Sequence, residues 1–359
     1  MQDRNSMRLR YGLACLLFVA STVFFSACDG FQRQLPDTVE IVPSPPISVP
    51  GTTLTDQLSW LRRHGQSGNH YIVEIGGDTI ITATNAALPT GRNITFRGTV
   101  PSRITGTFTV PPGVTLTLDQ NVTITGNSRG VTVQNGGRLI MNAGARITGN
   151  VVSSSVTGGD VTTGGGGVFV SGGGTFTMNG GEISGNTVTA NRTGGTSGNI
   201  TAQGGGVFVS SGGTFTMNGG EISGNTVTAN RTATGNQQGS VTAEGGGVFV
   251  SSSSTFTMNG GEISGNTVTA SRSVTVGTLV SRGGGVHVAG IFRISNGIVR
   301  GDESAEAEEL RNTSGDGLSA SLSNAGTAQR GTFSGGTFTS LGFLNTTNFT
   351  INVLNGNLR

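Results

Sequence analysis

The sequence predicts an all-β fold: a right-handed parallel β-helix (solenoid) of about eight coils, with projecting hairpins and a short N-terminal capping helix. Composition is the first observation, because 63 of the 359 residues are Gly, only 11% are charged, and strong helix formers are scarce. Thr, Val, Asn and Ser favour short strands and turns instead. Repetition is the second, since residues 165–193, 204–232 and 245–273 are nearly identical. Periodic repeats of this length are typical of solenoids.

The size of one coil follows from a recurring ending, Ile-x-Gly-Asn. The last residue of this motif is Asn127, Asn150, Asn186, Asn225 or Asn266, and successive copies are 23, 36, 39 and 41 residues apart. A 23-residue unit has room for three short strands, so the later intervals contain insertions of about 13, 16 and 18 residues. Strands this short must stack on the next coil, about 4.8 Å away and in register. We therefore expect interior columns through Phe176, Phe215 and Phe256, and through Ile183, Ile222 and Ile263.

The insertions alternate apolar and polar residues around Gly-rich turns, which is typical of hairpins. All of them begin after the Asn, so we expect them to project from one side of the solenoid and to form a lateral fin. At the ends, leucines at helical spacing in Thr53–His64 predict the capping helix, and 332–354 supplies the last strands.

The N-terminus has the form of an export signal. Arg8 and Arg10 precede an apolar run, Tyr11–Phe25, that ends in Ser-Ala-Cys28. This resembles a bacterial lipobox, which implies acylation of Cys28 and a membrane-anchored lipoprotein of the outer membrane or cell surface. An ordinary secretory peptide or an uncleaved signal anchor is the alternative. The other cysteine, Cys15, lies inside the signal, so the mature chain would contain no disulfide.

These boundaries divide the chain into four parts: signal peptide 1–27, Pro-rich tether 28–53, capping helix 54–70 and β-helix 71–359. The repeats within the β-helix are 165–203, 204–244, 245–282 and 283–302. Removing 1–27 takes away three of the 21 basic residues and one of the 19 acidic ones, which leaves 18 of each. A neutral surface without lysine gives no electrostatic footprint for nucleic acid.

Gly166-Gly167-Val168 followed by Ile183-x-x-Asn186 resembles the GG-aliphatic and F-x-x-N motifs of polymorphic outer-membrane protein repeats. The resemblance covers about 120–302, with Ile in place of Phe. It implies a surface-displayed β-helix that acts in adhesion or host contact. Those proteins often carry a C-terminal barrel, and this sequence shows no run of such strands before Arg359.

Repeated polar residues are the candidate ligand contacts. Arg192, Arg231 and Arg272 form a candidate row on the hairpins that could bind an anionic glycan, although solvated charges that protect strand edges give the same pattern. The segments 194–203, 233–244 and 274–282 vary most and are the expected contact loops. Two further rows are expected to be structural: an exposed stack of Glu182, Glu221 and Glu262, and the stacked turn residues Asn186, Asn225 and Asn266. Binding of a cation or another ligand is the alternative for the glutamates, and a recognition role is the alternative for the asparagines.

No catalytic, cofactor-binding or metal-binding residue is predicted. Asp119, Asp160, Glu244 and Asp302 are unrepeated acids without a recognisable catalytic pattern, and His64, His70 and His287 lack zinc spacing. Arg300-Gly301-Asp302 spells the integrin tripeptide but aligns with an ordinary coil turn, Ser184-Gly185-Asn186. The sequence therefore predicts a non-enzymatic interaction or adhesion surface, with a glycan or a matrix protein as its partner. A polysaccharide lyase or hydrolase is the alternative.

Overall fold

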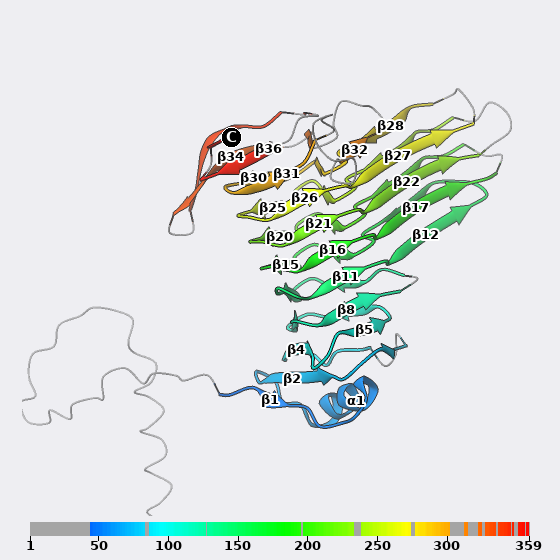
Figure 1. Cartoon of the computed structure of the whole chain (residues 1–359). Coiled ribbons are helices and arrows are strands. Elements are labelled where there is room, and N and C mark those ends of the chain that lie inside the picture. The colour runs from blue at the N-terminus through cyan, green and yellow to red at the C-terminus, as the bar shows by residue number, and fades with distance from the viewer. Residues whose placement is uncertain are drawn as a thin grey trace, which may run out of the picture. The chain divides into compact units, whose positions relative to one another are not determined.

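The computed structural model describes most of the chain from residue 44 onward. The ranges are 44–82, 86–126, 128–194, 197–232, 238–273, 277–301, 312–314, 322–324, 327–334, 337–345, 347, 351–355 and 357–358. The expected signal peptide, Cys28 and residues 29–43 of the tether lie outside them. The described residues contain one helix, α1 (Leu54–His64), and otherwise strands joined by turns (Figure 1).

Helix α1 covers the first coil, as the sequence predicts. Its N-cap Thr53 accepts a hydrogen bond from the Asp56 backbone N–H at 3.1 Å. Leu54, Leu58 and Leu61 are buried on the face that lies against the sheets. The helix ends at His64, as the leucine spacing in Thr53–His64 predicts, and the extended conformation of Gly65 terminates it.

Three of the five sheets in the described part of the chain, A, B and C, form the solenoid. In each sheet, neighbouring strands hydrogen-bond to each other, and except at the C-terminal end they come from successive coils. Sheet A is β1 (Ile47–Ser48), β2 (His70–Ile75), β4 (Asn93–Gly98), β7 (Thr115–Leu118), β10 (Arg138–Met141), β15 (Thr175–Met178), β20 (Thr214–Met217), β25 (Thr255–Met258), β30 (Ile291–Ile294), β34 (Thr327–Ser334) and β35 (Thr337–Phe343). Sheet B is β3 (Thr79–Ile80), β5 (Ser102–Thr105), β8 (Val122–Thr125), β11 (Arg146–Thr148), β16 (Glu182–Ser184), β21 (Glu221–Ser223), β26 (Glu262–Ser264), β31 (Gly297–Val299), β36 (Ile351–Leu354) and β37 (Asn357–Leu358). Sheet C is β6 (Phe108–Val110), β9 (Val131–Val133), β14 (Val168–Val170), β19 (Val207–Val209), β24 (Val248–Val250), β29 (Val286–Val288) and β33 (Leu322–Asn324).

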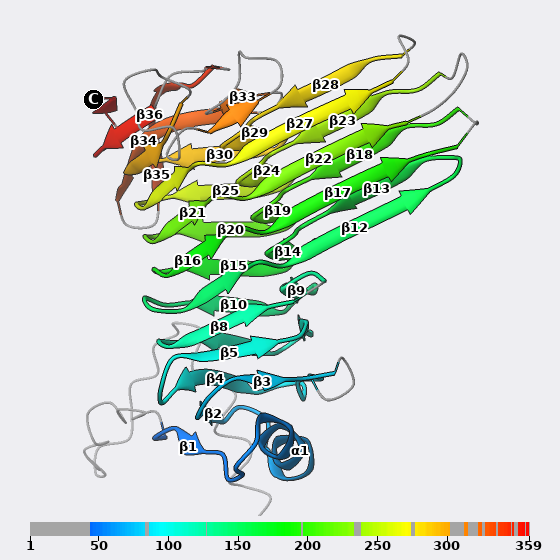
Figure 2. The same cartoon turned by 45° about the vertical axis from the view of Figure 1, so that its right-hand side comes forward.

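The insertions build two further sheets, D and E, which we call the fin (Figure 2). Sheet D is β12 (Val151–Val156), β17 (Thr187–Arg192), β22 (Thr226–Arg231), β27 (Thr267–Arg272) and β32 (Thr313–Ser314). Sheet E is β13 (Val161–Gly164), β18 (Ile200–Gln203), β23 (Val241–Glu244) and β28 (Leu279–Arg282).

The prediction of about eight coils is wrong, because the parallel β-solenoid has about five turns. These turns begin at β10, β15, β20, β25 and β30, and each sends a strand into sheet D. The insertions that the sequence predicts lie in these turns, which are therefore much longer than 23 residues. Strands β2 to β9, none of which belongs to sheet D or E, lead from the helix to the first of these wide turns.

The interior columns are confirmed. Phe176, Phe215 and Phe256 pair in register and are fully buried, with ring centroids 4.7 and 4.6 Å apart. The isoleucines of β16, β21 and β26 form a second column in the same way. Each aromatic face therefore packs on its own equivalent in the next coil, which makes the core a set of stacks along the axis.

The fin projects as predicted, but its two arms do not pair with each other. Each arm pairs instead, in parallel, with the same arm of the neighbouring coil, as in Thr187–Arg192 with Thr226–Arg231. Alternation turns Val188 and Ala190 inward, where they join residues of sheet E in a second buried apolar cluster. Pairing across coils is favoured because it satisfies both edges of an inner strand, whereas a hairpin alone would satisfy one.

A ladder of buried asparagines marks the point where the chain leaves the solenoid for the fin. The side-chain amides of Asn150, Asn186, Asn225 and Asn266 each donate to the carbonyl oxygen of the next, at 2.8–2.9 Å. The last acceptor is Asn312, so Asn312 and not Asp302 continues the row. The pairing of Ile263 with Val299 places Arg300 at the position of Ser184, as the sequence alignment predicts, and Asp302 lies outside the described residues.

The C-terminal strands reverse direction. Strand β34 still pairs in parallel with β30, but β35 is antiparallel to β34, and β36 is antiparallel to β31. These strands include the final ones expected within 332–354. The acidic segment 303–311 lies outside the described residues.

The Phe column supplies a stability prediction. Phe215→Asp should lower the free energy of unfolding by at least about 4 kcal/mol, since it removes a stacked ring and buries an unpaired charge. Thr216→Asp, on the outward half-exposed face of the same strand, is the matched control and should cost under about 1 kcal/mol. Urea unfolding followed by circular dichroism measures both, and equal stability of the two variants would contradict the register.

Candidate functional site

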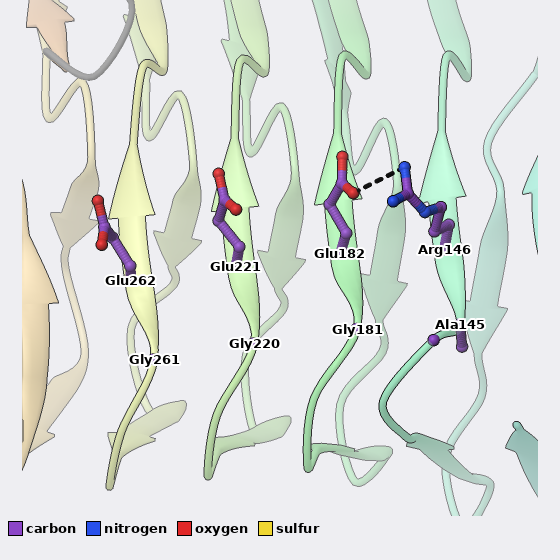
Figure 3. A pocket seen from close by; sticks show the side chains of 9 residues that line it. Ala145, Arg146, Gly181, Glu182, Gly220, Glu221, Gly261 and Glu262 are labelled. Carbon is purple, nitrogen blue, oxygen red and sulfur yellow. Dashed lines mark ion pairs between the residues drawn. The ribbon is translucent and has the colours of Figure 1, made fainter. Parts of the chain in front are cut away.

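A groove of about 540 Å³ runs along the corner that joins sheets A and B, across successive coils. Its polar side chains are those of Arg146, Glu182, Glu221 and Glu262, which occupy equivalent positions on β11, β16, β21 and β26 (Figure 3). The expected glutamate stack therefore exists and forms one wall of the groove.

Glycines and Ala145 line the rest of the groove. Gly181, Gly220 and Gly261 have φ of 85°, 89° and 92°, in the left-handed region that favours glycine. A Cβ at Gly220 would lie 2.6 Å from the Gly181 carbonyl oxygen of the coil below. A side chain at Gly220 would therefore clash with the neighbouring coil, and the Gly-Gly turn leaves backbone exposed beside the carboxylates.

Charge in the groove is partly neutralised. Arg146 Nη1 lies 2.9 Å from Glu182 Oε2, and Arg300 Nε lies 2.9 Å from Glu262 Oε1. Between them, Glu221 is exposed, and its carboxylate has neither ion pair nor hydrogen bond within the described part of the chain. The groove thus offers one carboxylate flanked by two ion pairs, which suits a ligand with hydroxyl groups or a positive charge.

The arginine row lies elsewhere than expected. Arg192 and Arg231 are fully buried inside the fin, and Arg272 is half-buried. Arg192 Nη1 donates to Gly159 O at 3.0 Å, and Arg231 Nη1 donates to Gly239 O at 2.9 Å. Arg192 and Arg231 have no exposed surface, so they can neither contact a large ligand in solvent nor act as solvated charges at a strand edge. Both expectations for the row are therefore wrong for these two residues.

The expected contact loops need a correction as well. Segments 194–203, 233–244 and 274–282 each end in a strand of sheet E, where Ile200, Ala202, Val241 and Ala243 are fully buried. Only the residues before those strands are turns. Alternation in Ile200–Gln203 is the sequence signal that identifies these strands.

A buried ionic cluster was missed at the junction of sheets C and E. Glu244 accepts hydrogen bonds from Arg282 Nε and Gln203 Nε2, both at 2.9 Å, and lies 3.7 Å from His287 Nε2. His287 stacks on Phe249 at 5.3 Å, at the end of the outward column Phe169, Phe208 and Phe249. The sequence signal lies in the fourth repeat. There His287 stands at the position of Phe249, and Arg282 stands at the position of Gln203 and Glu244.

The remaining candidates do not form a common site. Asp119 pairs with Arg97 at 3.1 Å, and Asp160 accepts a hydrogen bond from the Asn199 backbone. His70 bonds Thr95, whereas His64 lies on α1. Among the described residues, no group of three or more His, Cys, Asp or Glu side chains could hold a metal ion.

Comparison with protein-family models, curated proteins and solved structures found no match to this chain. Of the resemblance to outer-membrane repeats, the structure supports the parallel β-solenoid. Within the described ranges, no helix has the length and apolar character that a membrane span requires.

His287 supplies a pH prediction. Burial, opposed by Glu244 and reinforced by Arg282, lowers the pKa of His287 from 6.5 to about 4. The unfolded chain therefore binds a proton that the folded chain does not, so stability falls as pH drops below 6.5 and levels off near 4. At pH 5 this costs about 2 kcal/mol.

His287→Phe should remove this loss, because it continues the aromatic column with a ring that cannot titrate. Urea unfolding at pH 7.5 and 5.0 measures it, with His64→Phe on the exposed helix surface as the control. Parallel pH profiles for wild type and His287→Phe would contradict the burial of a neutral histidine.

Proposed function

We propose that this protein is a lipid-anchored, extracytoplasmic surface protein whose solenoid acts as a non-enzymatic interaction or adhesion surface. Its partner is a glycan or an extracellular matrix protein. The anchor is the acyl group expected on Cys28, at the outer membrane or cell surface.

The observation that carries the proposal is the repetition of outward side chains in register. Glu182, Glu221 and Glu262 occupy one row beside the groove, at the spacing of the strands. A linear partner with its own repeat can contact several equivalent positions at once, which raises its apparent affinity without any strong single contact.

The same repetition favours binding over catalysis. A general acid and a general base need different environments to hold different protonation states. The groove carboxylates are instead equivalent members of one row, and the unrepeated acids Asp119, Asp160 and Glu244 are each engaged with different partners.

Lipidation is tested directly. Radiolabelled palmitate should be incorporated into the wild-type chain and not into Cys28→Ala, which should appear in the soluble fraction. Cys15→Ala is the matched control and should be labelled normally. Labelling that persists in Cys28→Ala would contradict the anchor.

Binding is tested by applying the mature protein to an array of glycans and matrix proteins. Replacing Glu182, Glu221 and Glu262 together by Gln should weaken the strongest interaction at least tenfold, because it removes the groove's carboxylates without changing their shape. Replacing Thr177, Thr216 and Thr257 by Ser, on the outward face of sheet A, is the control. Unchanged binding by the Gln variant excludes the groove, and depolymerisation of a glycan would favour the enzyme instead.

A further inference from the structure

The fin has an open edge on the side of the N-terminal coils. Strands β12 and β13 are the first strands of sheets D and E, and each pairs with a single neighbour, β17 and β18 respectively (Figure 2). Among the described residues, the preceding coil contributes no strand to either sheet, because its chain passes from β8 to β9. We call the outer sides of β12 and β13 the fin edge. Such an edge presents backbone donors and acceptors that another strand can pair with.

The hydrogen bonds of the ladder show which backbone groups of β12 point out of the fin edge. In a parallel pair, alternate residues of a strand bond to opposite neighbours. Thr193 N, at the end of β17, donates to Val156 O at 3.1 Å, so the even-numbered residues of β12 bond to β17. Ser153 and Ser155 therefore direct their N–H and C=O groups outward, where no described residue pairs with them.

The apolar interior of the fin is also open at this edge. Val152 and Val156 point inward and pack against the second apolar cluster, but both are only partly buried. Val188, the partner of Val152 in the next coil, is fully buried. On the outward face, Val151 is 39% exposed. The first coil of the solenoid is covered by α1, whereas the fin edge leaves both valines and backbone groups in water, and one added strand would cover both.

Strand β12 lacks the devices that protect a sheet edge. Residues 151–156 contain no charged residue and no proline, and the pairing with β17 has no bulge. Part of β13, in contrast, is already covered. Arg129 donates to Gly164 O from Nη2 at 2.6 Å and to Gly165 O from Nε at 3.0 Å. The part of the fin edge that is free to pair is therefore β12.

The sequence of β12, Val-Val-Ser-Ser-Ser-Val, fits a second copy of itself in antiparallel pairing. A two-fold axis at Ser154 places Ser153 opposite Ser155 of the second copy, and Val152 opposite Val156. The two serines are the residues whose backbone groups point outward, so each Ser153–Ser155 pair exchanges both of its backbone hydrogen bonds. The valines meet in the non-hydrogen-bonded pairs, where side chains lie closest, and each copy closes the apolar interior of the other.

We propose that β12 pairs with β12 of a second copy of this chain, antiparallel about Ser154, and forms a two-fold symmetric dimer. The same edge serves in both copies, so the assembly closes at two and does not grow into a filament. A partner of different sequence would not require β12 to be symmetric about its centre. The interface uses no residue of the groove, and it goes beyond the proposed surface function by presenting two grooves in one assembly.

Disulfide trapping tests the register in a full-length chain with Cys15 and Cys28 replaced by Ala. Ser154→Cys places two thiols at the two-fold axis, in a non-hydrogen-bonded pair with Cα atoms about 4.5 Å apart, which a disulfide can span. Oxidised glutathione should convert most of this variant to a covalent dimer on a non-reducing gel. Ser155→Cys is the matched control, because its two copies are diagonal neighbours about 8 Å apart, and it should cross-link at least tenfold more slowly. Equal cross-linking of the two variants, or none in Ser154→Cys, would overturn the register.

Sedimentation equilibrium tests the dimer without a cross-link. From about 1 to 100 μM, the same cysteine-free chain should pass from monomer to dimer. Ser155→Pro removes an outward N–H donor and leaves the ladder to β17 intact, so it should raise the dissociation constant at least tenfold. Ser155→Thr keeps the donor and should dimerise like the parent chain. A parent chain that stays monomeric, assembles beyond two copies, or dimerises as tightly with Ser155→Pro would contradict the interface, and none of these results bears on the array experiment.

Discussion

The structure depends on one constraint: each residue of a wide turn lies directly over the residue at the same position of the next turn. Parallel pairing at the strand spacing imposes this, and it acts on side chains as strongly as on the backbone. Phe stacks on Phe, Ile on Ile, and the Asn amides bond to one another in a buried row. A position can therefore hold only a residue that tolerates its own copy as a neighbour.

Charges show how narrow this tolerance is. Glutamates can form a row because they face water at the groove, with Arg146 and Arg300 at its two ends. Arginines form a row inside the fin only where glycine turns bring carbonyl oxygens to them. In the fourth repeat, Arg282 and His287 replace the residues found at the equivalent positions of the earlier repeats. The two changes occur together because both side chains lie against Glu244.

Much of the solenoid was predictable because repetition gives the register directly. The Phe and Ile columns, the capping helix and the projecting fin all follow from aligned copies and from apolar periodicity. The number of turns did not follow, although the positions and approximate lengths of the insertions did. The expected pairing of the two arms within each insertion was wrong, because the turn chemistry favoured hairpins. Each arm instead pairs with the equivalent arm of the neighbouring coil, as Thr187 pairs with Thr226. The alternation that turns Val188 and Ala190 inward also places Arg192 on the inward face, but an arginine at a strand end is normally exposed, so its full burial was not expected.

The near-identity of the three central repeats has a consequence for the length of the molecule. Thr175, Thr214 and Thr255 are successive partners in sheet A, so excising one whole repeat would join Thr175 to Thr255 and recreate the same contact. The same holds for the isoleucines of the core and the arginines of the fin. Unequal recombination between such copies changes the chain by whole turns and keeps these columns paired as before. Length, and with it the number of carboxylates along the groove, is thus a property that this fold can alter in steps.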